Sequence, residues 1–310
     1  IQTQHKLSLD QLYWRRHTIE NKLKGDAERF KQEFPLTAVE AFLTSGRGRF
    51  DRERVMAWPI DDPMRGYLQQ EDSFGDGAIS FIPQRDGELR LWKRPQTGHS
   101  LVIGADSAEG IEIEGAPSDD KYDYSSAHVA DRDTGEIVAH LHGHFEPKEF
   151  GRQLFRLGKW YNRAFIGVER NGNGISVLDS LGYLGYPDSL IYARTNSPEG
   201  TRYATPQKGW VTTTVTRPRM INRLSDTVRD RSLIVHCRET QREFLTFVVN
   251  ADGKPEAQQG SKDDRVFSLG IARMMLDAAP PQEVKEKETD TFSIPLRPTT
   301  YRPAHYAANV

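Results

Sequence analysis

The 310-residue sequence predicts an α/β fold with a mixed central sheet flanked by helices, preceded by an N-terminal helical and extended segment. Three apolar runs follow one another at 99–106, 125–133 and 136–145, and Thr134 and Gly135 are typical of a hairpin turn. Helical and strand patterns then alternate as far as residue 279. Hairpin-linked strands followed by this alternation indicate a mixed rather than a purely parallel sheet.

The composition excludes several classes of protein. Hydrophobic residues make up 36% and charged residues 28% of the chain, which is ordinary for a globular protein and unlike a disordered one. No apolar run reaches the roughly 18 residues of a membrane span. The single cysteine, Cys237, excludes an internal disulfide framework and fits a reducing compartment. The net charge of −2 does not indicate a nucleic-acid binder, although an acidic metal site would mask local basic patches.

Residues 1–95 are expected to form a linker segment rather than part of the main domain. Ser8 and Gln11 match a capping box at the start of a charged, amphipathic helix. Asp86 and Gly87 mark a tight turn between two apolar runs. The expected elements are helices at 8–23, 26–33 and 37–42, an extended connection at 44–65 and a hairpin at 78–94.

The remaining elements complete a recognisable order. The expected elements are helices at 150–162, 175–185, 217–231 and 263–279, strands at 164–171, 190–194 and 232–237, a segment at 238–249 open between helix and strand, and a Pro-rich tail at 280–310. We therefore assign residues 96–279 to one domain. Its order of three strands, helix, strand, helix and strand, with late helices, matches the ribonuclease H-like arrangement. In that arrangement, acids at strand ends and on a late helix converge.

Acidic residues occupy the positions that this arrangement brings together. Asp106 and Glu169 each end an apolar strand, and Asp263 and Asp264 open the last helix. Ligands of open α/β sheets bind beyond the carboxyl ends of the strands. Carboxylates gathered there repel one another unless a hard cation such as Mg²⁺ or Mn²⁺ binds between them. We therefore expect Asp106, Glu169 and a third acid, Asp264 or its neighbour Asp263, to form a triad that binds divalent cations.

Other site types lack their partner motifs. A strand that ends in Asp also suits a nucleotide-binding site, but the chain has no G-x-x-x-x-G-K-[ST] loop, so we expect no ATPase site in it. No G-x-S-x-G supports a serine hydrolase. His140, His142 and His144 share one strand face, which we interpret as an exposed or edge face rather than a zinc site.

Basic residues near the acids are candidates for contacts with DNA. Lys262 and Arg265 flank the acid pair, and Arg170 follows Glu169. Arg217, Arg219 and Arg223 are expected to form a ridge on one helix that binds phosphates, with a solvated helix face as the alternative.

Six sequence blocks, in order, resemble the nuclease part of the large terminase subunit of tailed bacteriophages. The blocks are EFPLTAVEAFLTSG (33–46), VIGADSAEG (102–110), DYSSAHVADRDTGEIVAH (123–140), FIGVERNGNG (165–174), GWVTTTVTRPRMINRL (209–224) and GSKDDRVFSLGIA (260–272).

The resemblance implies a ribonuclease H-like fold and metal-dependent cleavage of concatemeric double-stranded DNA during genome packaging. It implies the small terminase subunit and the portal protein as partners, and the host cytoplasm as the place of action. The family's acids fall on Asp106, Glu169 and the pair of Asp263 and Asp264, of which we expect the second to be the ligand.

The chain departs from the family pattern in three places. The family's ATP-binding motor would precede residue 1, so we expect this chain to be a fragment that does not translocate DNA. Residues 109–122 resemble a lengthened loop, which leaves the role of Asp123 open. Lys262 stands where many members have a histidine. Two alternatives remain: another ribonuclease H-like enzyme, such as a junction resolvase or transposase, or a non-catalytic module that docks on a portal or partner subunit.

Overall fold

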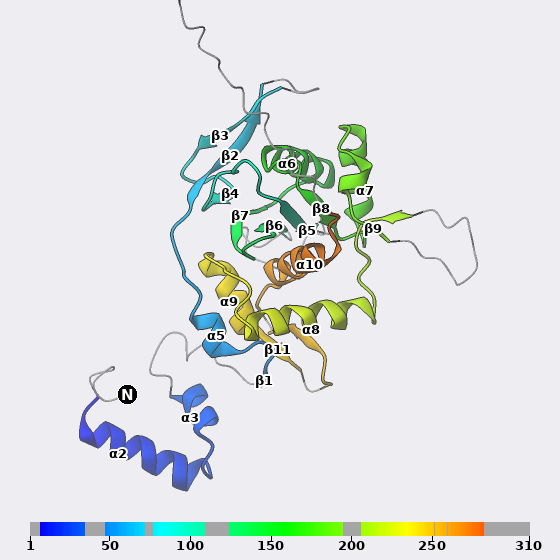
Figure 1. The fold of residues 1–310 in the computed structure, drawn as a ribbon. Coiled ribbons are helices and arrows are strands. Elements are labelled where there is room, and N and C mark those ends of the chain that lie inside the picture. The colour runs from blue at the N-terminus through cyan, green and yellow to red at the C-terminus, as the bar shows by residue number, and fades with distance from the viewer. Residues whose placement is uncertain are drawn as a thin grey trace, which may run out of the picture.

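The computed structural model describes most of the chain (Figure 1). The described residues are 7–34, 47–71, 77–108, 124–194, 206–250, 252–258 and 260–281. The helix expected at 37–42, the loop at 109–122 with Asp123, and nearly all of the tail at 280–310 lie outside them. No described helix combines the length and the apolar character needed to cross a membrane.

A seven-stranded mixed sheet forms the centre of the fold, which confirms the predicted fold class. The strands are β2 (Met64–Gln70), β3 (Ile79–Pro83), β4 (Leu89–Leu91), β5 (Leu101–Asp106), β6 (Ser125–Asp131), β7 (Ile137–Gly143) and β8 (Phe165–Val168). Their order across the sheet is β3-β2-β4-β7-β6-β5-β8. Only the β5 and β8 pair is parallel among these neighbours, and the hairpin predicted between β6 and β7 is present.

The hairpin predicted at 78–94 is wrong. Both β3 and β4 form, but each pairs with β2, which starts at the end of the expected connection and lies between them. Alternating hydrophobicity shows that a segment is extended and half-buried, and it does not identify the partner strand. Since β4 also pairs with β7, the boundary expected at residue 95 divides a single sheet.

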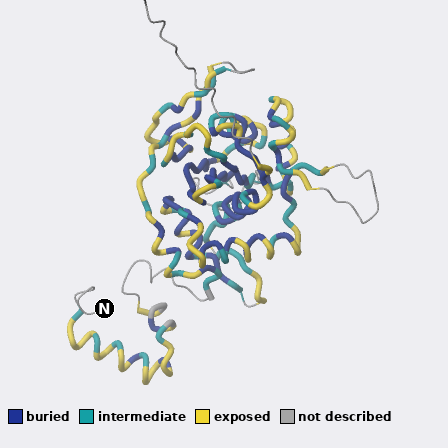
Figure 2. The backbone as a smooth tube through the Cα atoms, viewed as in Figure 1, coloured by how far each residue is buried: buried dark blue, intermediate teal, exposed yellow. Residues whose placement is uncertain are grey.

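Helices cover both faces of the sheet (Figure 1). On one face α6 (Pro147–Trp160) and α7 (Gly174–Tyr183) share a core with β5, β6 and β7. On the other face α8 (Thr216–Arg229), α9 (Arg238–Thr246) and α10 (Asp264–Ala278) form a second core. Buried backbone is concentrated in the sheet and in the helix sides that face it (Figure 2).

The alternation along β5 decides which residues face α10. Ile103 and Ala105 pack into the core with α6 and α7, so Val102, Gly104 and Asp106 point to the opposite face. α10 packs there across β5 and β6. A Cβ atom on Gly104 would lie 1.9 Å from the backbone nitrogen of Ala272. The missing side chain of Gly104 therefore sets how closely α10 approaches the strand.

The N-terminal helices lie apart from the sheet in Figure 1. The capping box of Ser8 and Gln11 is present at the start of α2 (Leu9–His17), which continues as a π-helical segment, η1 (Thr18–Lys22). α3 (Ala27–Glu33) follows, and Trp14 contacts the rings of Phe30 and Phe34.

Short elements connect the larger ones. They are β1 (Arg47–Gly48), α5 (Arg52–Met56), η2 (Asp188–Leu190), β9 (Ala193–Arg194), β10 (Gln207–Lys208), β11 (Phe247–Val249) and β12 (Pro255–Ala257). The ambiguous segment at 238–249 is helical first and extended afterwards. The strand expected at 232–237 is reduced to one bridge between Ile234 and Glu136.

We expect Gly104→Ala to lower the free energy of unfolding by about 3 kcal/mol, because the added methyl group collides with rigid helix backbone. Urea unfolding followed by circular dichroism measures this change. Gly182→Ala is the matched control: no atom lies within 4 Å of the added methyl group, so it should stabilise α7 by up to about 1 kcal/mol. Equal stability of both variants would contradict close packing at Gly104.

Candidate active site

Asp106 and Glu169 lie side by side because β5 and β8 are parallel neighbours. Ala105 pairs with Val168, and the Glu169 amide donates a hydrogen bond of 2.8 Å to the Ala105 carbonyl oxygen. The Glu169 carboxyl group lies close enough to that of Asp106 for its charge and a hydrogen bond to raise the pKa of Asp106. One register therefore brings two acids into contact at the carboxyl ends of two parallel strands.

The start of α10 adds the other two acids. Asp264 is the first helical residue and Asp263 occupies the N-cap position. The pKa of Asp106 is raised well above its usual value, first by desolvation, then by the charge of Glu169 and its hydrogen bond, and then by Asp264 and Asp263. Four carboxylates thus gather where the positive end of the α10 dipole meets the sheet.

A glycine-rich turn presents Glu169. Gly172 has a φ of +57°, and a Cβ atom on Gly174 would lie 1.7 Å from the carbonyl oxygen of Glu169. The Asn171 side chain exchanges hydrogen bonds of 2.8 and 3.1 Å with the backbone of Thr212. The close approach at Gly174 leaves no room for a side chain there. The hydrogen bonds of Asn171 connect the turn to the segment that leads into α8.

No protein-family model matches the sequence, and no curated protein is significantly similar to it. Solved structures do match. The cobalt-bound large terminase nuclease from thermophilic phage G20c is 17% identical, with a TM-score of 0.52 over 74% of this chain and 98% of that chain. Its magnesium-bound form is also 17% identical, with a TM-score of 0.51 and the same coverage. This chain has the fold of a phage large-terminase nuclease.

Within this terminase-nuclease fold, buried histidines adjoin the acid cluster, so the exposed or edge face predicted for them is wrong. β7 lies inside the sheet, and His140 and His142 are buried, whereas only His144, beyond the strand end, is exposed. The Ser126 hydroxyl lies 3.1 Å from Nε2 of His140 and 2.8 Å from the Ser268 hydroxyl.

The same network reaches the first turn of α10. The Ser268 hydroxyl lies 2.9 Å from Nδ1 of His128 and 2.9 Å from the Asp264 carbonyl oxygen. Burial lowers the pKa of His128 and His140 well below the usual range, so both imidazoles are neutral hydrogen-bonding groups. The network therefore anchors the helix turn that carries Asp264 to the central strands.

The basic residues expected to contact DNA lie in different surroundings. Arg265 forms a buried ion pair with Glu243, and its Nη2 lies 3.1 Å from Nδ1 of His142, so its guanidinium is engaged inside the protein. The Lys262 ammonium lies 6.0 Å from the centre of the Tyr124 ring. Arg170 donates a 2.9 Å hydrogen bond to the Lys208 carbonyl oxygen.

The predicted ridge of three arginines on α8 is absent. At about 100° per residue, Arg219 and Arg223 lie about 40° apart around the helix, whereas Arg217 lies about 160° from Arg219. Arg223 pairs with Asp277 at 2.9 Å. The Arg217 guanidinium lies 5.0 Å from the Phe267 ring centre and donates a 2.7 Å hydrogen bond to the Pro255 carbonyl oxygen. Only Arg217 therefore turns toward the start of α10.

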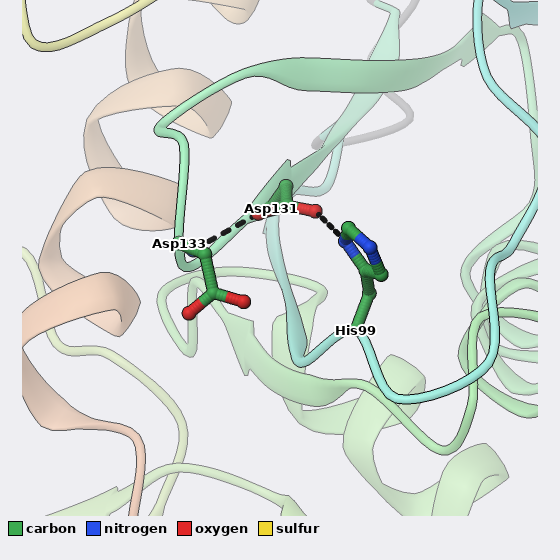
Figure 3. Close-up of side chains that lie close together, drawn as sticks. All are labelled: His99, Asp131 and Asp133. Atoms are coloured by element: carbon green, nitrogen blue, oxygen red, sulfur yellow. Dashed lines mark hydrogen bonds and ion pairs between the residues drawn. The ribbon is translucent and has the colours of Figure 1, made fainter.

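A second cluster, of His99, Asp131 and Asp133 (Figure 3), lies at the end of the β5–β6 ladder opposite to Asp106. Ligand atoms of His99, Asp131 and Asp133 lie within 4.8 Å of one another, a spacing that the acids around Asp106 do not meet among the described residues. Asp131 accepts hydrogen bonds from the backbone amides of Asp133 and Thr134, at 2.9 and 3.1 Å, and lies 2.6 Å from Nδ1 of His99. These contacts brace the turn between β6 and β7 and account for the cluster without a metal.

Sequence reasoning missed Glu243 and the buried histidine network. Nothing in the segment at 238–249 distinguishes Glu243 from its exposed neighbours until α9 is packed against α10. The available signal was that apolar residues surround His140 and His142 in the sequence, as expected of a buried strand. Buried polar side chains are generally hydrogen-bonded, so a hydrogen-bonded network could have been expected there.

The buried histidines predict acid sensitivity. Burial lowers the pKa of His142 to about 2, and those of His128 and His140 are also low. The unfolded chain binds protons below a pH of about 6.5, whereas the folded protein does not, so stability falls as the pH drops through that value. Each histidine contributes up to about 1.4 kcal/mol per pH unit. Urea unfolding from pH 7.5 to 5.5 should show that the free energy of unfolding falls less steeply with pH in His142→Gln than in the parent. Equal slopes of this free energy against pH would contradict a neutral, buried His142.

Proposed function

We propose that this protein is a divalent-metal-dependent endodeoxyribonuclease that cuts concatemeric viral DNA during genome packaging. The observation that carries the proposal is the contact between the carboxyl groups of Asp106 and Glu169, with Asp264 and Asp263 beside them. Nuclease domains of large terminases with bound cobalt or magnesium share the fold, which supports this activity.

The residues at the site fit hard divalent cations. All four groups are carboxylates, and in the absence of a cation desolvation, followed by the charges of the other three acids, raises the pKa of Asp106. Asp106, Glu169 and Asp264 would hold two ions, Mg²⁺ or Mn²⁺, with Asp263 as the neighbouring acid. Bound there, the cations would supply activation of water and stabilisation of the leaving oxygen.

The protein's own groups orient this chemistry. The Ser268 network holds the first turn of α10, and the turn at Gly174 holds Glu169. Lys262, Arg170 and Arg217 are proposed to contact DNA phosphates, with Arg219 and Arg223 as more distant surface contacts. Arg265 is assigned a positioning role through Glu243 and His142.

We propose double-stranded DNA as the substrate and the host cytoplasm as the place of action. The small terminase subunit and the portal protein are the proposed partners.

Asp106→Asn, Glu169→Gln and Asp264→Asn should each reduce the nicking of supercoiled plasmid by at least about 100-fold, because each removes a metal ligand. Gel assays in Mg²⁺ or Mn²⁺ measure the loss, and circular dichroism checks the fold. Asp133→Asn, in the cluster at the opposite end of the sheet, is the control and should cut like the parent. Cutting by all three variants, or cutting by the parent in EDTA, would reject the metal-dependent mechanism at these acids, whereas a parent that cuts no DNA in either metal would favour a docking module.

Mn²⁺ should raise the melting temperature of the parent, since binding to the native state at 100 times Kd stabilises it by about 2.7 kcal/mol. Asp106→Asn should melt at a higher temperature than the parent in EDTA, because it removes one repelling charge, and should lose most of the response to Mn²⁺. Differential scanning fluorimetry measures both effects. An undiminished Mn²⁺ response in Asp106→Asn would place the ion elsewhere, with His99, Asp131 and Asp133 as the next candidates.

A further inference from the structure

An open groove of about 1130 Å³ lies between the start of α8, the β11–β12 hairpin and β1. Its cationic side chains come from three separate elements: Arg49 follows β1, Arg217 belongs to α8, and Lys254 lies at the tip of the hairpin. Among the described residues that line the groove, Asp252 is the only acid. The groove is therefore locally cationic in a chain whose net charge is −2.

The groove adjoins the segments that carry the acid cluster. Thr212 lines it and exchanges two hydrogen bonds with Asn171, two residues after Glu169. Arg217 also lines it, and its guanidinium lies 5.0 Å from the ring centre of Phe267, three residues after Asp264. Two separate contacts therefore place one side of the groove beside the segments that present Glu169 and Asp264.

The groove offers hydrogen-bond donors suited to an anionic chain. Arg49 donates 2.5 Å and 3.4 Å hydrogen bonds to Asn222 and Ser225, which position its guanidinium and use two of its five N–H donors among the described residues. Arg217 is positioned by Phe267 and Pro255. Thr213 and Thr214 add hydroxyl groups. Arginine, lysine and threonine side chains typically donate hydrogen bonds to phosphate oxygens.

We infer that this groove binds the sugar-phosphate backbone of a DNA strand that leads away from the acid cluster. The inference rests on the proposed nuclease function and adds Arg49 and Lys254 to the DNA-contacting surface. Because the groove presents cations and hydroxyl groups toward phosphates, recognition there is independent of base sequence.

The test compares two triple variants of the full chain. The groove variant carries Arg49→Ala, Arg217→Ala and Lys254→Ala. The control carries Arg229→Ala, Arg238→Ala and Arg242→Ala, which removes the same charge from exposed residues of α8 and α9 that do not line the groove. Binding of a fluorescent DNA duplex of random sequence is measured by anisotropy from 50 to 300 mM salt in an Asp106→Asn background, so that the duplex stays intact. Cleavage is measured with Asp106 present.

The groove variant should bind about 10- to 100-fold more weakly, and its plot of log affinity against log salt should flatten by about 0.9 for each phosphate that the variant no longer neutralises. Its KM for DNA should rise with little change in kcat, and the control should match the parent. Lys254→Glu alters an exposed side chain whose ion pair with Glu256 spans 3.7 Å, so it should weaken binding with little change in melting temperature.

Two results would overturn the inference. Unchanged binding by the groove variant and by Lys254→Glu, with cleavage intact in the parent, would reject the groove and leave the nuclease function standing. Equal losses in the groove and control variants would show a general charge effect and would also reject the groove. A parent that neither binds nor cuts DNA would reject the nuclease function, and the groove with it.

Discussion

The close packing of α10 against β5 is the constraint on which the rest of the structure depends. At Gly104 the helix backbone occupies the space that any side chain would fill. That contact sets the distance between the last helix and the central strand, and with it the distance between Asp264 and Asp106. Asp106 ends β5 and Asp264 begins α10, so their relative position is only as precise as the packing between these two elements.

Without a cation, the acid cluster lowers the stability of the fold, and hydrogen bonds and an ion pair around it offset this loss. Asp106 is desolvated beside three other acids, which raises its pKa. The Ser268 hydroxyl donates a hydrogen bond to the Asp264 carbonyl oxygen and is hydrogen-bonded to Ser126 and His128, and these contacts hold the helix in place against that repulsion. The imidazoles of His128 and His140 are neutral, so they add hydrogen bonds to this network without adding charge. Arg265 and Glu243 add a buried ion pair immediately beside the acids.

Positive charge is distributed by tertiary contacts rather than by sequence proximity. Arg217 and Arg219 are two residues apart, yet one faces the groove and the start of α10 while the other lies on the far side of the helix. Arg49 joins Arg217 across more than 160 residues of sequence because β1 pairs with β11, whose hairpin carries Lys254. The cationic groove near the acids is therefore assembled from three elements.

The sequence by itself determined the fold class, most of the helices and strands, and the positions of the acids. Those features follow from local periodicity and from the residue that ends each apolar strand, as in β5 and β8, and both are written in short stretches of chain. Only the tertiary structure decided that β2 separates β3 from β4, that His140 and His142 are buried, and that Arg265 pairs with Glu243. These depend on strand partners and helix packing between distant segments. Local sequence patterns indicate on which face of a strand or helix a side chain lies. Packing between distant segments decides which residues contact that face.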